Sequence, residues 1–329
     1  MKTVITGSIA YDYLMIYPGD FVEMLRADDN LTKISVSFLV DEMTRHRGGV
    51  GPNIAYTLAL LGERPILVGT AGQDFPEYQA FLEGMGVDVS GVRIHEDLFT
   101  ASFFVTTDRD NNQIASFYTG AMARARDLSL LEAVEGSADL VVIGPNDPQA
   151  MRNYIRECRT LGIPFMYDPS QQVARVSGEE LADGVQGAEI LIVNDVEHRA
   201  LLKKTSLTHD DLLVQASTVI VTRGEDGADI YTRDRTLHIP IVPPGRIADP
   251  TGVGDAFRAG VLKGLAAGWP WEISGRVGAL AATYALEQHG TQSHRFTRTE
   301  FVERFRKHFD DGGLLDEMLN ESDEQGTTA

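Results

Sequence analysis

The feature that most constrains this chain is the stretch Asp249–Phe257, DPTGVGDAF, which leads into an apolar helix. Gly252 and Gly254 can adopt backbone dihedrals that a β-carbon forbids, so successive peptide N–H groups can converge on one point. The helix that begins near Asp255 directs its positive end at the same point, which suits a phosphate. A carboxylate at Asp255 can accept a proton from an attacking alcohol while amides hold the transferring phosphoryl group. The stretch therefore predicts phosphoryl transfer.

An ordinary helix N-terminus is the alternative explanation, because Asp is a favoured N-cap and Gly is common in turns. The longer string weighs against it, since DPTGVGDAF resembles the C-terminal signature of the ribokinase-like (phosphofructokinase-B) kinases. In that family the last Asp is the catalytic base and the glycines form an anion hole. The resemblance implies these roles for Asp255 and for Gly252, Val253 and Gly254. No Gly-Lys-Ser/Thr loop occurs elsewhere in the sequence.

Composition limits the classes of partner. A chain of 329 residues with 43% hydrophobic content can bury a large core in one or two domains. The net charge of −19 argues against binding to nucleic acid or to an anionic membrane surface. The single cysteine, Cys158, excludes an intramolecular disulfide, and its helical surroundings favour a buried residue over a nucleophile. Without a long apolar run or a basic, apolar leader, we expect a cytoplasmic protein that is not inserted in a membrane.

Strands and helices alternate from about residue 138 to residue 240, the rhythm of parallel βαβ units. Val4–Ser8 has the composition of a buried first strand. Ligands bind beyond the carboxyl ends of such strands, and polar residues fall there. The later strands are expected at Leu140–Ile143, Ile163–Tyr167, Ile190–Val193 and Val219–Thr222, and the polar residues are Asn146, Asp168, Gln171, Gln172, Asn194 and Thr222.

Residues 33–40, 100–107 and 113–118 alternate like antiparallel strands with one wet face, and Asp108–Asn112 forms the turn between the last two. They predict a small sheet that projects from the main body, as does the lid of the resembled family. Its aromatic side chains could stack on a flat base, although ordinary sheet packing explains any one of them. These aromatic residues are Phe103, Phe104, Phe117 and Tyr118.

We therefore expect a three-layer α/β/α domain of the ribokinase-like type with a mostly parallel central sheet and a small β-sheet lid. The polar, acidic C-terminal end is expected to fray into a mobile tail. The division is residues 1–10, 41–99 and 119–320 for the nucleotide-binding core, 11–40 and 100–118 for the lid, and 321–329 for a flexible acidic tail.

Three further motifs match the family in part. Arg47–Asn53, RGGVGPN, opens the apolar helix Ile54–Leu61 and resembles the N-terminal Gly-Gly signature, with Val50 and Pro52 as departures; a glycine turn with an Asn cap explains it equally. Asn194-Asp-Val-Glu197 resembles the Asn-x-x-Glu motif of the phosphate and Mg²⁺ side, but a capping box has the same letters. Thr222–Gly227 resembles a nucleotide-binding Gly-x-x-Gly turn and by itself is a hairpin signal.

Several strings resemble bacterial adenosine kinases more than sugar kinases, among them TGSIA before Asp12, SFLV from Ser37, HRGGV from His46, IASFY from Ile114 and DPSQQ from Asp168. The resemblance reaches to about residue 290. It implies that the nucleoside is bound by Ser8, Asp12, Ser37, Gly48, Gly49, Asn53, Phe103, Phe117, Met122, Gln171, Gln172 and Arg175. It assigns ATP to Asn194, Thr222, Gly224 and Gly227, and Mg²⁺, through water, to Glu197.

The implied reaction is transfer of the γ-phosphate of ATP to the 5′-hydroxyl of adenosine, with Asp255 as general base and a lid that excludes water. A sugar kinase or a broad-specificity nucleoside kinase is the second interpretation, since Asp12 and the Gly-Gly turn suit any ribose. A catalytically silent nucleotide-binding protein is the third. The resemblance further suggests a homodimer through the lid and leaves open a monovalent cation such as K⁺ near the Asp249 turn.

Overall fold

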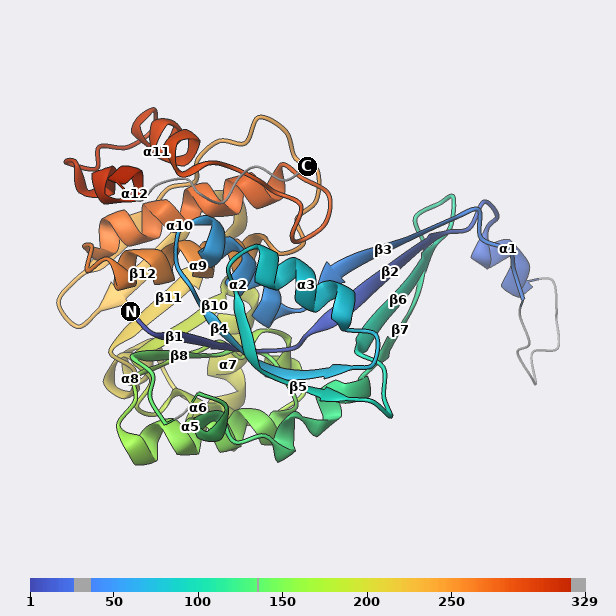
Figure 1. Cartoon of the computed structure of the whole chain (residues 1–329), viewed down its shortest axis with the longest axis horizontal. Coiled ribbons are helices and arrows are strands. Elements are labelled where there is room, and N and C mark those ends of the chain that lie inside the picture. The colour runs from blue at the N-terminus through green and yellow to red at the C-terminus, as the bar shows by residue number, and fades with distance from the viewer. Residues whose placement is uncertain (27–36, 135, 321–329) are drawn as a thin grey trace.

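The computed structural model of the chain describes residues 1–26, 37–134 and 136–320. Two sheets organise it: a nine-stranded sheet in the main body and a four-stranded sheet that projects from it (Figure 1). In spatial order the large sheet contains β13 (Thr236–Ile239), β12 (Ala228–Thr232), β11 (Thr218–Thr222), β10 (Ile190–Asn194), β9 (Phe165–Tyr167), β8 (Leu140–Ile143), β1 (Thr3–Thr6), β4 (Ile66–Gly72) and β5 (Asp88–His95).

The strands from β11 to β5 are parallel to one another, while β12 and β13 are antiparallel additions at one edge. The predicted strands from Leu140, Ile190 and Val219 are confirmed within a residue or two at each end, and the strand expected at Ile163–Tyr167 is shorter, at Phe165–Tyr167. Since β8 and β4 flank β1, the strand order changes direction there, and a crevice is expected at its carboxyl end.

Successive residues of the central strands enter opposite cores. Val4 and Val141 pack with the helices of one face, whereas Ile5 and Val142 pack with those of the other. One face is covered by α2 (Val50–Leu60), α9 (Val253–Ala266) and α10 (Trp271–Leu286), and the other by α5 (Pro148–Leu161), α6 (Gly178–Val185), α7 (Asp195–Thr205) and α8 (His209–Gln215). Burial on both faces explains why these strands are continuous apolar runs, and the predicted three layers are confirmed.

The small sheet has the order β3 (Glu42–Gly48), β2 (Ala10–Ile16), β6 (Ala101–Thr107) and β7 (Gln113–Tyr118). The two strands and the turn expected at 100–118 are confirmed. The strand expected at 33–40 is wrong for residues 37–40, which form no regular structure, and residues 33–36 lie outside the described part. The sheet is completed instead by β2, which pairs with β6, and by β3, which pairs with β2, so it extends beyond residue 40 to Gly48. The polar sequence of β3, EMTRHRG, lacks the alternation that marks a strand.

The remaining elements surround this frame. In chain order they are α1 (Phe21–Arg26), α3 (Pro76–Gly84), the 3₁₀ helix η1 (Gly120–Asp127), α4 (Leu130–Ala133), η2 (Ser170–Ala174), η3 (Gly224–Asp226), α11 (Arg298–Arg306), η4 (Leu314–Asp316) and α12 (Glu317–Asn320). The described part of the chain ends with η4 and α12, and the tail predicted at 321–329 lies outside the described residues. Cys158 is buried in α5, and burial raises the pKa of its thiol to about 12, which suits a packing residue.

Helices α9 and α10 approach one another through glycine. A β-carbon at Gly260 would lie 2.5 Å from both Cα and N of Gly278, so the two backbones leave no room for a side chain. Gly84, at the end of α3, has nothing within 4 Å of the same position.

We predict opposite effects for two alanine substitutions. Gly260→Ala should lower the free energy of unfolding by about 1–3 kcal/mol, because the added methyl group meets backbone. Gly84→Ala should raise it by up to about 1 kcal/mol, because the helix gains propensity at an open site. Urea unfolding of both variants measures the difference, and equal effects would contradict the close packing of α9 on α10.

Candidate active site

A cavity of about 1320 Å³ lies at the carboxyl ends of the parallel strands. Ser8, Asn194 and Thr222, which follow or end three of those strands, line it. The backbone N–H of Ser8 donates to the carbonyl of Pro145, which ties the segment after β1 to the segment after β8. Four residues of the small sheet also line the cavity, so the main body and the projecting sheet enclose it together. They are Ala10, Asp12, Phe103 and Phe117.

The glycine stretch forms the turn expected of it. Gly252 has a φ of 78°, a left-handed conformation that favours glycine, and a β-carbon there would lie 3.0 Å from Thr291. Helix α9 begins at Val253, and no side chain in the described part of the chain caps it. The first N–H groups of a helix have no partner inside it, and the residues that carry them here, Val253 to Asp255, line the cavity. The N–H of Val253 donates to the carbonyl of Pro250 at 3.5 Å, and those of Gly254 and Asp255 are available as donors for an anion. The Asp249 carboxylate holds the turn by accepting from the N–H groups of Thr251 and Gly290.

Asp255 lies in the first turn of α9 and on the cavity wall, with 8% of its surface exposed. Its Oδ2 accepts a hydrogen bond from Nδ2 of Asn53 at 2.8 Å. Burial raises the pKa of Asp255 to about 6, although the Arg258 guanidinium and the Asn53 amide oppose the shift. A carboxyl group that ionises near neutral pH, beside free backbone donors, has the properties of a general base.

Arg258 lies one helical turn after Asp255 and was not foreseen from the sequence as a site residue. It pairs with Asp168 through two contacts, Nε to Oδ2 at 2.5 Å and Nη2 to Oδ1 at 2.8 Å, and both side chains are almost fully buried. A β-carbon at Gly254 would lie 2.8 Å from Nη1 of Arg258. A positive charge therefore sits beneath the turn that carries the helix N-terminus. The sequence did offer one indication of a role for Arg258: it follows Asp255 by three residues, and side chains at that spacing are neighbours on a helix surface.

Asp12, on β2, faces the cavity beside the Gly-Gly turn. Burial raises the pKa of Asp12 to about 6, partly offset by His46. A β-carbon at Gly48 would lie 2.5 Å from Oδ2 of Asp12, and Gly49 has a φ of 93°. Gly49 lines the cavity, but Gly48 does not; it leaves space for the carboxylate behind the wall. Ser8 and Asn53 lie on the wall as expected, whereas Ser37 is exposed and outside it.

The aromatic residues of the small sheet divide between its two faces. Phe103 and Phe117 are cross-strand neighbours that line the cavity, as does Met122 of η1. Phe104 stacks on Tyr13, with ring centroids 4.7 Å apart. Neither Phe104 nor Tyr118 lines the cavity, so sheet packing explains Phe104. Of the four predicted aromatic residues, Phe103 and Phe117 are therefore the two placed to stack on a flat ring.

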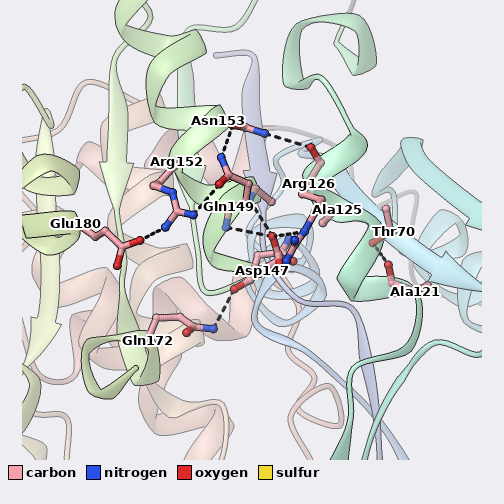
Figure 2. A network of polar contacts seen from close by, with 12 residues as sticks. Thr70, Ala121, Ala125, Arg126, Asp147, Gln149, Arg152, Asn153, Gln172 and Glu180 are labelled. Carbon is pink, nitrogen blue, oxygen red and sulfur yellow. Dashed lines mark hydrogen bonds and ion pairs between the residues drawn. The ribbon is translucent and has the colours of Figure 1, made fainter. Parts of the chain in front are cut away.

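Helix η2 contributes Gln171 and Gln172, and Arg175 follows directly after it. These three predicted residues differ in role. Gln171 and Arg175 are exposed on the cavity wall. Gln172 also lines the cavity, but it is buried and its Nε2 donates to the backbone carbonyl of Asn146 at 2.9 Å. Figure 2 shows Gln172 at the edge of the polar network around Asp147, whose carboxylate caps α5 and pairs with Arg126. Gln172 therefore fixes the position of the loop.

Asn194 and Glu197 form a capping box at the start of α7, so this alternative is confirmed. The Asn194 side chain accepts from the Glu197 N–H, and Oε2 of Glu197 accepts from the Asn194 N–H, both at 2.8 Å. Both residues also line the cavity. Burial raises the pKa of Glu197. Within the described residues no group of three or more His, Cys, Asp or Glu side chains could hold a metal ion.

The turn from Thr222 to Gly227 joins β11 to β12 as the predicted hairpin. Gly224 and Gly227 have φ values of 60° and 82°. A β-carbon at Gly227 would lie 2.1 Å from the carbonyl oxygen of Ile239, so glycine is required there. Thr222, Gly224 and Gly227 all line the cavity, on the same side as Asn194.

Two buried residues behind Asn53 were also not foreseen. Gln292, in the loop after α10, and Tyr78, on α3, join Asn53 in a hydrogen-bonded chain. No local pattern indicates them, because each is separated from its partner by more than 200 residues.

In the described ranges no helix combines the length and apolar character needed to cross a membrane.

Comparisons with known proteins show which family and which solved structures this chain is similar to. The sequence profile described as pfkB family carbohydrate kinase matches residues 7–297. The Burkholderia thailandensis nucleoside kinase, solved in complex with inosine, is 37% identical with a TM-score of 0.82, and the match covers 93% of this chain and 98% of that one. The Methanocaldococcus jannaschii nucleoside kinase structure has a TM-score of 0.82 at 27% identity, covering 94% and 99%. The Methanothermobacter thermautotrophicus nucleoside kinase is 31% identical over 302 residues, covering 91% and 94%.

The raised pKa of Asp255 predicts a pH-dependent gain in stability for Asp255→Asn. The folded state raises the pKa from 3.8 to about 6, so the carboxyl group's contribution is fully present below pH 3.8 and is lost as the pH rises through about 6. At pH 8 the variant should therefore be more stable than wild type by about 2–3 kcal/mol. At pH 4, where the folded group is protonated, the gain should be nearly absent. Urea unfolding at both pH values measures it.

Asp108→Asn is the matched control. Burial alone would raise the pKa of Asp108, but hydrogen bonds from Phe21, Asn112 and Asp110 lower it below its ordinary value. This variant should be less stable than wild type at pH 8, the opposite sign. An Asp255→Asn effect that is equal at pH 4 and pH 8 would contradict the burial of an ionised carboxylate.

Proposed function

This chain belongs to the pfkB family of carbohydrate kinases, and we propose that it is a nucleoside kinase that transfers the γ-phosphate of ATP to the 5′-hydroxyl of a purine nucleoside. One observation carries the proposal: a buried carboxylate, Asp255, stands on the cavity wall in the first turn of an uncapped helix. The fold, with a large mostly parallel sheet and a small separate sheet, is ribokinase-like, and the kinases matched above share it.

Asp255 serves as the general base. As the nucleoside's 5′-oxygen attacks the γ-phosphorus of ATP, its proton passes to the Asp255 carboxylate, and the bond from the γ-phosphorus to the bridging oxygen breaks to release ADP. The backbone N–H groups of residues 252–255 and the positive end of α9 stabilise the charge that develops on the phosphoryl oxygens. The Asn53 amide, which donates to the carboxylate, keeps the base ionised near neutral pH.

The nucleoside side of the cavity is assigned by the chemistry of its wall. Asp12 accepts from two neighbouring ribose hydroxyls, and Ser8, Gly49 and Asn53 lie beside it. Phe103 and Phe117 provide a stacking surface for the base. Met122, Gln171 and Arg175 complete this side, and Gln172 holds the loop that carries Gln171 and Arg175.

The nucleotide side is formed by the opposite wall. We assign ATP to Asn194, Thr222, Gly224 and Gly227, all of which line the cavity. Oε2 of Glu197 is engaged in the capping box, so a Mg²⁺ ion carried by ATP would meet Glu197 through water, which suits an ion that keeps several waters. The ion would neutralise phosphate charge. A monovalent cation such as K⁺ near Asp249 is part of the same proposal.

We propose that the small sheet is a lid and that a second copy of the chain docks on it. Strand β7 is an edge strand whose residues are all exposed, with 47% of Ile114 and 42% of both Phe117 and Tyr118 accessible. An exposed apolar edge strand is a site for pairing with another chain. A homodimer would cover it and enclose the base-binding side of the cavity.

The acceptor within the nucleoside class is the finer part of the proposal. The sequence resemblance favours adenosine, while the Burkholderia relative is solved with inosine. Phe103 and Phe117 bind a ring by its face, which discriminates weakly among bases, so broad specificity fits the same wall. A catalytically silent protein remains the contrasting function, and the intact Asp255 with its free helix N-terminus weighs against it.

Asp255→Asn should lower kcat by about 10²–10⁴-fold, because the base is lost while the donors to the phosphoryl group remain. Nucleoside binding, measured by calorimetry, should change little. Tyr154→Phe, a buried change on α5 outside the cavity, is the control and should keep wild-type turnover. Near-normal turnover by Asp255→Asn would reject the assigned base.

A substrate panel tests the function itself. With ATP and Mg²⁺, initial rates should be at least about tenfold higher for adenosine or inosine than for ribose or fructose 6-phosphate, because free sugars cannot use the aromatic wall. Adenosine alone would indicate a specific adenosine kinase, and several nucleosides a broad one. Preference for a free sugar, or no phosphorylation at all, would refute the nucleoside kinase.

A further inference from the structure

A chain of four buried hydrogen-bonded side chains runs from Asp255 into the protein interior. Asn53 Nδ2 donates to Oδ2 of Asp255 at 2.8 Å, and Gln292 Nε2 donates to Oδ1 of Asn53 at 2.8 Å. Gln292 Nε2 also donates to the Tyr78 hydroxyl, which in turn donates to the backbone carbonyl of Gly48 at 3.0 Å. Asn53, Tyr78 and Gln292 are 4%, 0% and 6% exposed, so water does not compete with these bonds.

The far end of this chain fixes the direction of every bond in it. A backbone carbonyl can only accept, so the Tyr78 hydroxyl must donate to Gly48 and accept from Gln292. The Gln292 NH₂ group is thereby turned toward both Tyr78 and Asn53, and Asn53 must present its oxygen to Gln292. Its NH₂ group then points at Asp255. Burial raises the pKa of Tyr78 well above its ordinary value, which keeps this hydroxyl a donor.

We propose that Gln292 and Tyr78 are positioning residues that orient the Asn53 amide so that it donates to the Asp255 carboxylate. The inference rests on the proposed function only in naming Asp255 as the base. Neither residue lines the cavity, so both act through Asn53.

The reversed amide shows why the orientation matters. An Asn side chain has nearly the same shape after a half-turn of its amide, so sterics alone do not select one orientation. The reversed amide would place Oδ1 of Asn53 against a carboxylate oxygen, an arrangement that only a protonated Asp255 tolerates. The other charged groups that act on Asp255 are Arg258, Asp168 and Glu197. The two carboxylates disfavour its ionised form, so Arg258 and a correctly oriented Asn53 must offset them.

The arrangement leaves one polar atom unsatisfied. Oε1 of Gln292 is buried and has no hydrogen-bond partner among the described residues. An apolar residue of similar size would avoid that penalty, so packing alone does not account for glutamine here. The same loop is tied down by Thr291, whose hydroxyl donates to the carbonyl of Arg47. It is also tied to the turn around Gly252, because the Asp249 carboxylate accepts from the N–H of Gly290. The loop that carries Gln292 is therefore held from both that turn and strand β3.

The experiment compares Gln292→Met and Tyr78→Phe with wild type and with Tyr154→Phe. Tyr154 is the matched control, because it is fully buried on a helix and donates to a backbone carbonyl, that of Ala125, also at 3.0 Å. The readout is the acidic limb of the pH profile of kcat/KM for the best nucleoside of the panel. Gln292→Met should raise the midpoint of this limb by about one pH unit, because the carboxylate loses its oriented donor. On the limb itself, this shift corresponds to a kcat/KM that is roughly tenfold lower than that of wild type.

Tyr78→Phe should shift the midpoint in the same direction by a smaller amount, and Tyr154→Phe should leave it unchanged. A second readout needs no turnover: the side-chain carboxyl of Asp255 is titrated by ¹³C NMR, assigned by its loss in Asp255→Asn. If wild type phosphorylates no nucleoside, the proposed function fails and this titration alone decides the inference. Midpoints for Gln292→Met and Tyr78→Phe that coincide with those of wild type and Tyr154→Phe would overturn it.

Discussion

The hydrogen bond between Asn53 and Asp255 joins the two helices that build the site. Helices α2 and α9 pack on the same face of the large sheet, and both begin at the edge where its parallel strands end. The bond therefore brings a polar side chain from near the start of one helix onto the carboxylate at the start of the other. Together with the Arg258 guanidinium, this donor lowers the pKa of the buried carboxyl group and so favours its ionised form near neutral pH. The proposed chemistry depends on this contact, and the rest of the fold serves to bring its two ends together.

Several charged side chains around that contact are removed from water, and their burial lowers the stability of the folded protein. Asp255 and the Arg258–Asp168 pair are buried close to the cavity, and Asp12 is half-buried on its wall. Loss of hydration is the main reason that the pKa of both Asp255 and Asp12 is raised to about 6. Removing charges from water is expensive even when they are paired. A chain selected for stability alone would replace several of these residues with apolar ones. Their concentration at one edge of the sheet marks a candidate functional site, and it suits the proton and phosphoryl transfer that we propose.

The small sheet gives the cavity its second wall, and its two faces perform different tasks. Asp12 and Phe103 are paired across β2 and β6 on the face that lines the cavity, and Phe117 extends it onto β7. On the other face Tyr13 stacks on Phe104, and Arg45 lies over the ring of Tyr11. A sheet of four strands that projects from the main body gains stability from side-chain packing on both of its faces. The Gly-Gly turn lies where this sheet meets α2, and Gly48 leaves the space that Asp12 occupies.

The sequence alone determined the features that depend on neighbouring residues. The turn and helix at Asp249–Phe257, the apolar strands from Leu140, Ile190 and Val219, and the capping box from Asn194 to Glu197 each follow from local backbone preference or burial on both faces. The tertiary structure alone decided which distant segments meet. The polar strand Glu42–Gly48 is a strand because β2 pairs with it, and residues 37–40, whose alternation looked more suitable, have no such partner. Tyr78 and Gln292 carry no local signal of their roles, because the direction of a hydrogen bond in a buried chain is set by a partner far away in the sequence. Arg258 lies near Asp255 in the helix register, but its pairing with Asp168 was decided by the tertiary structure.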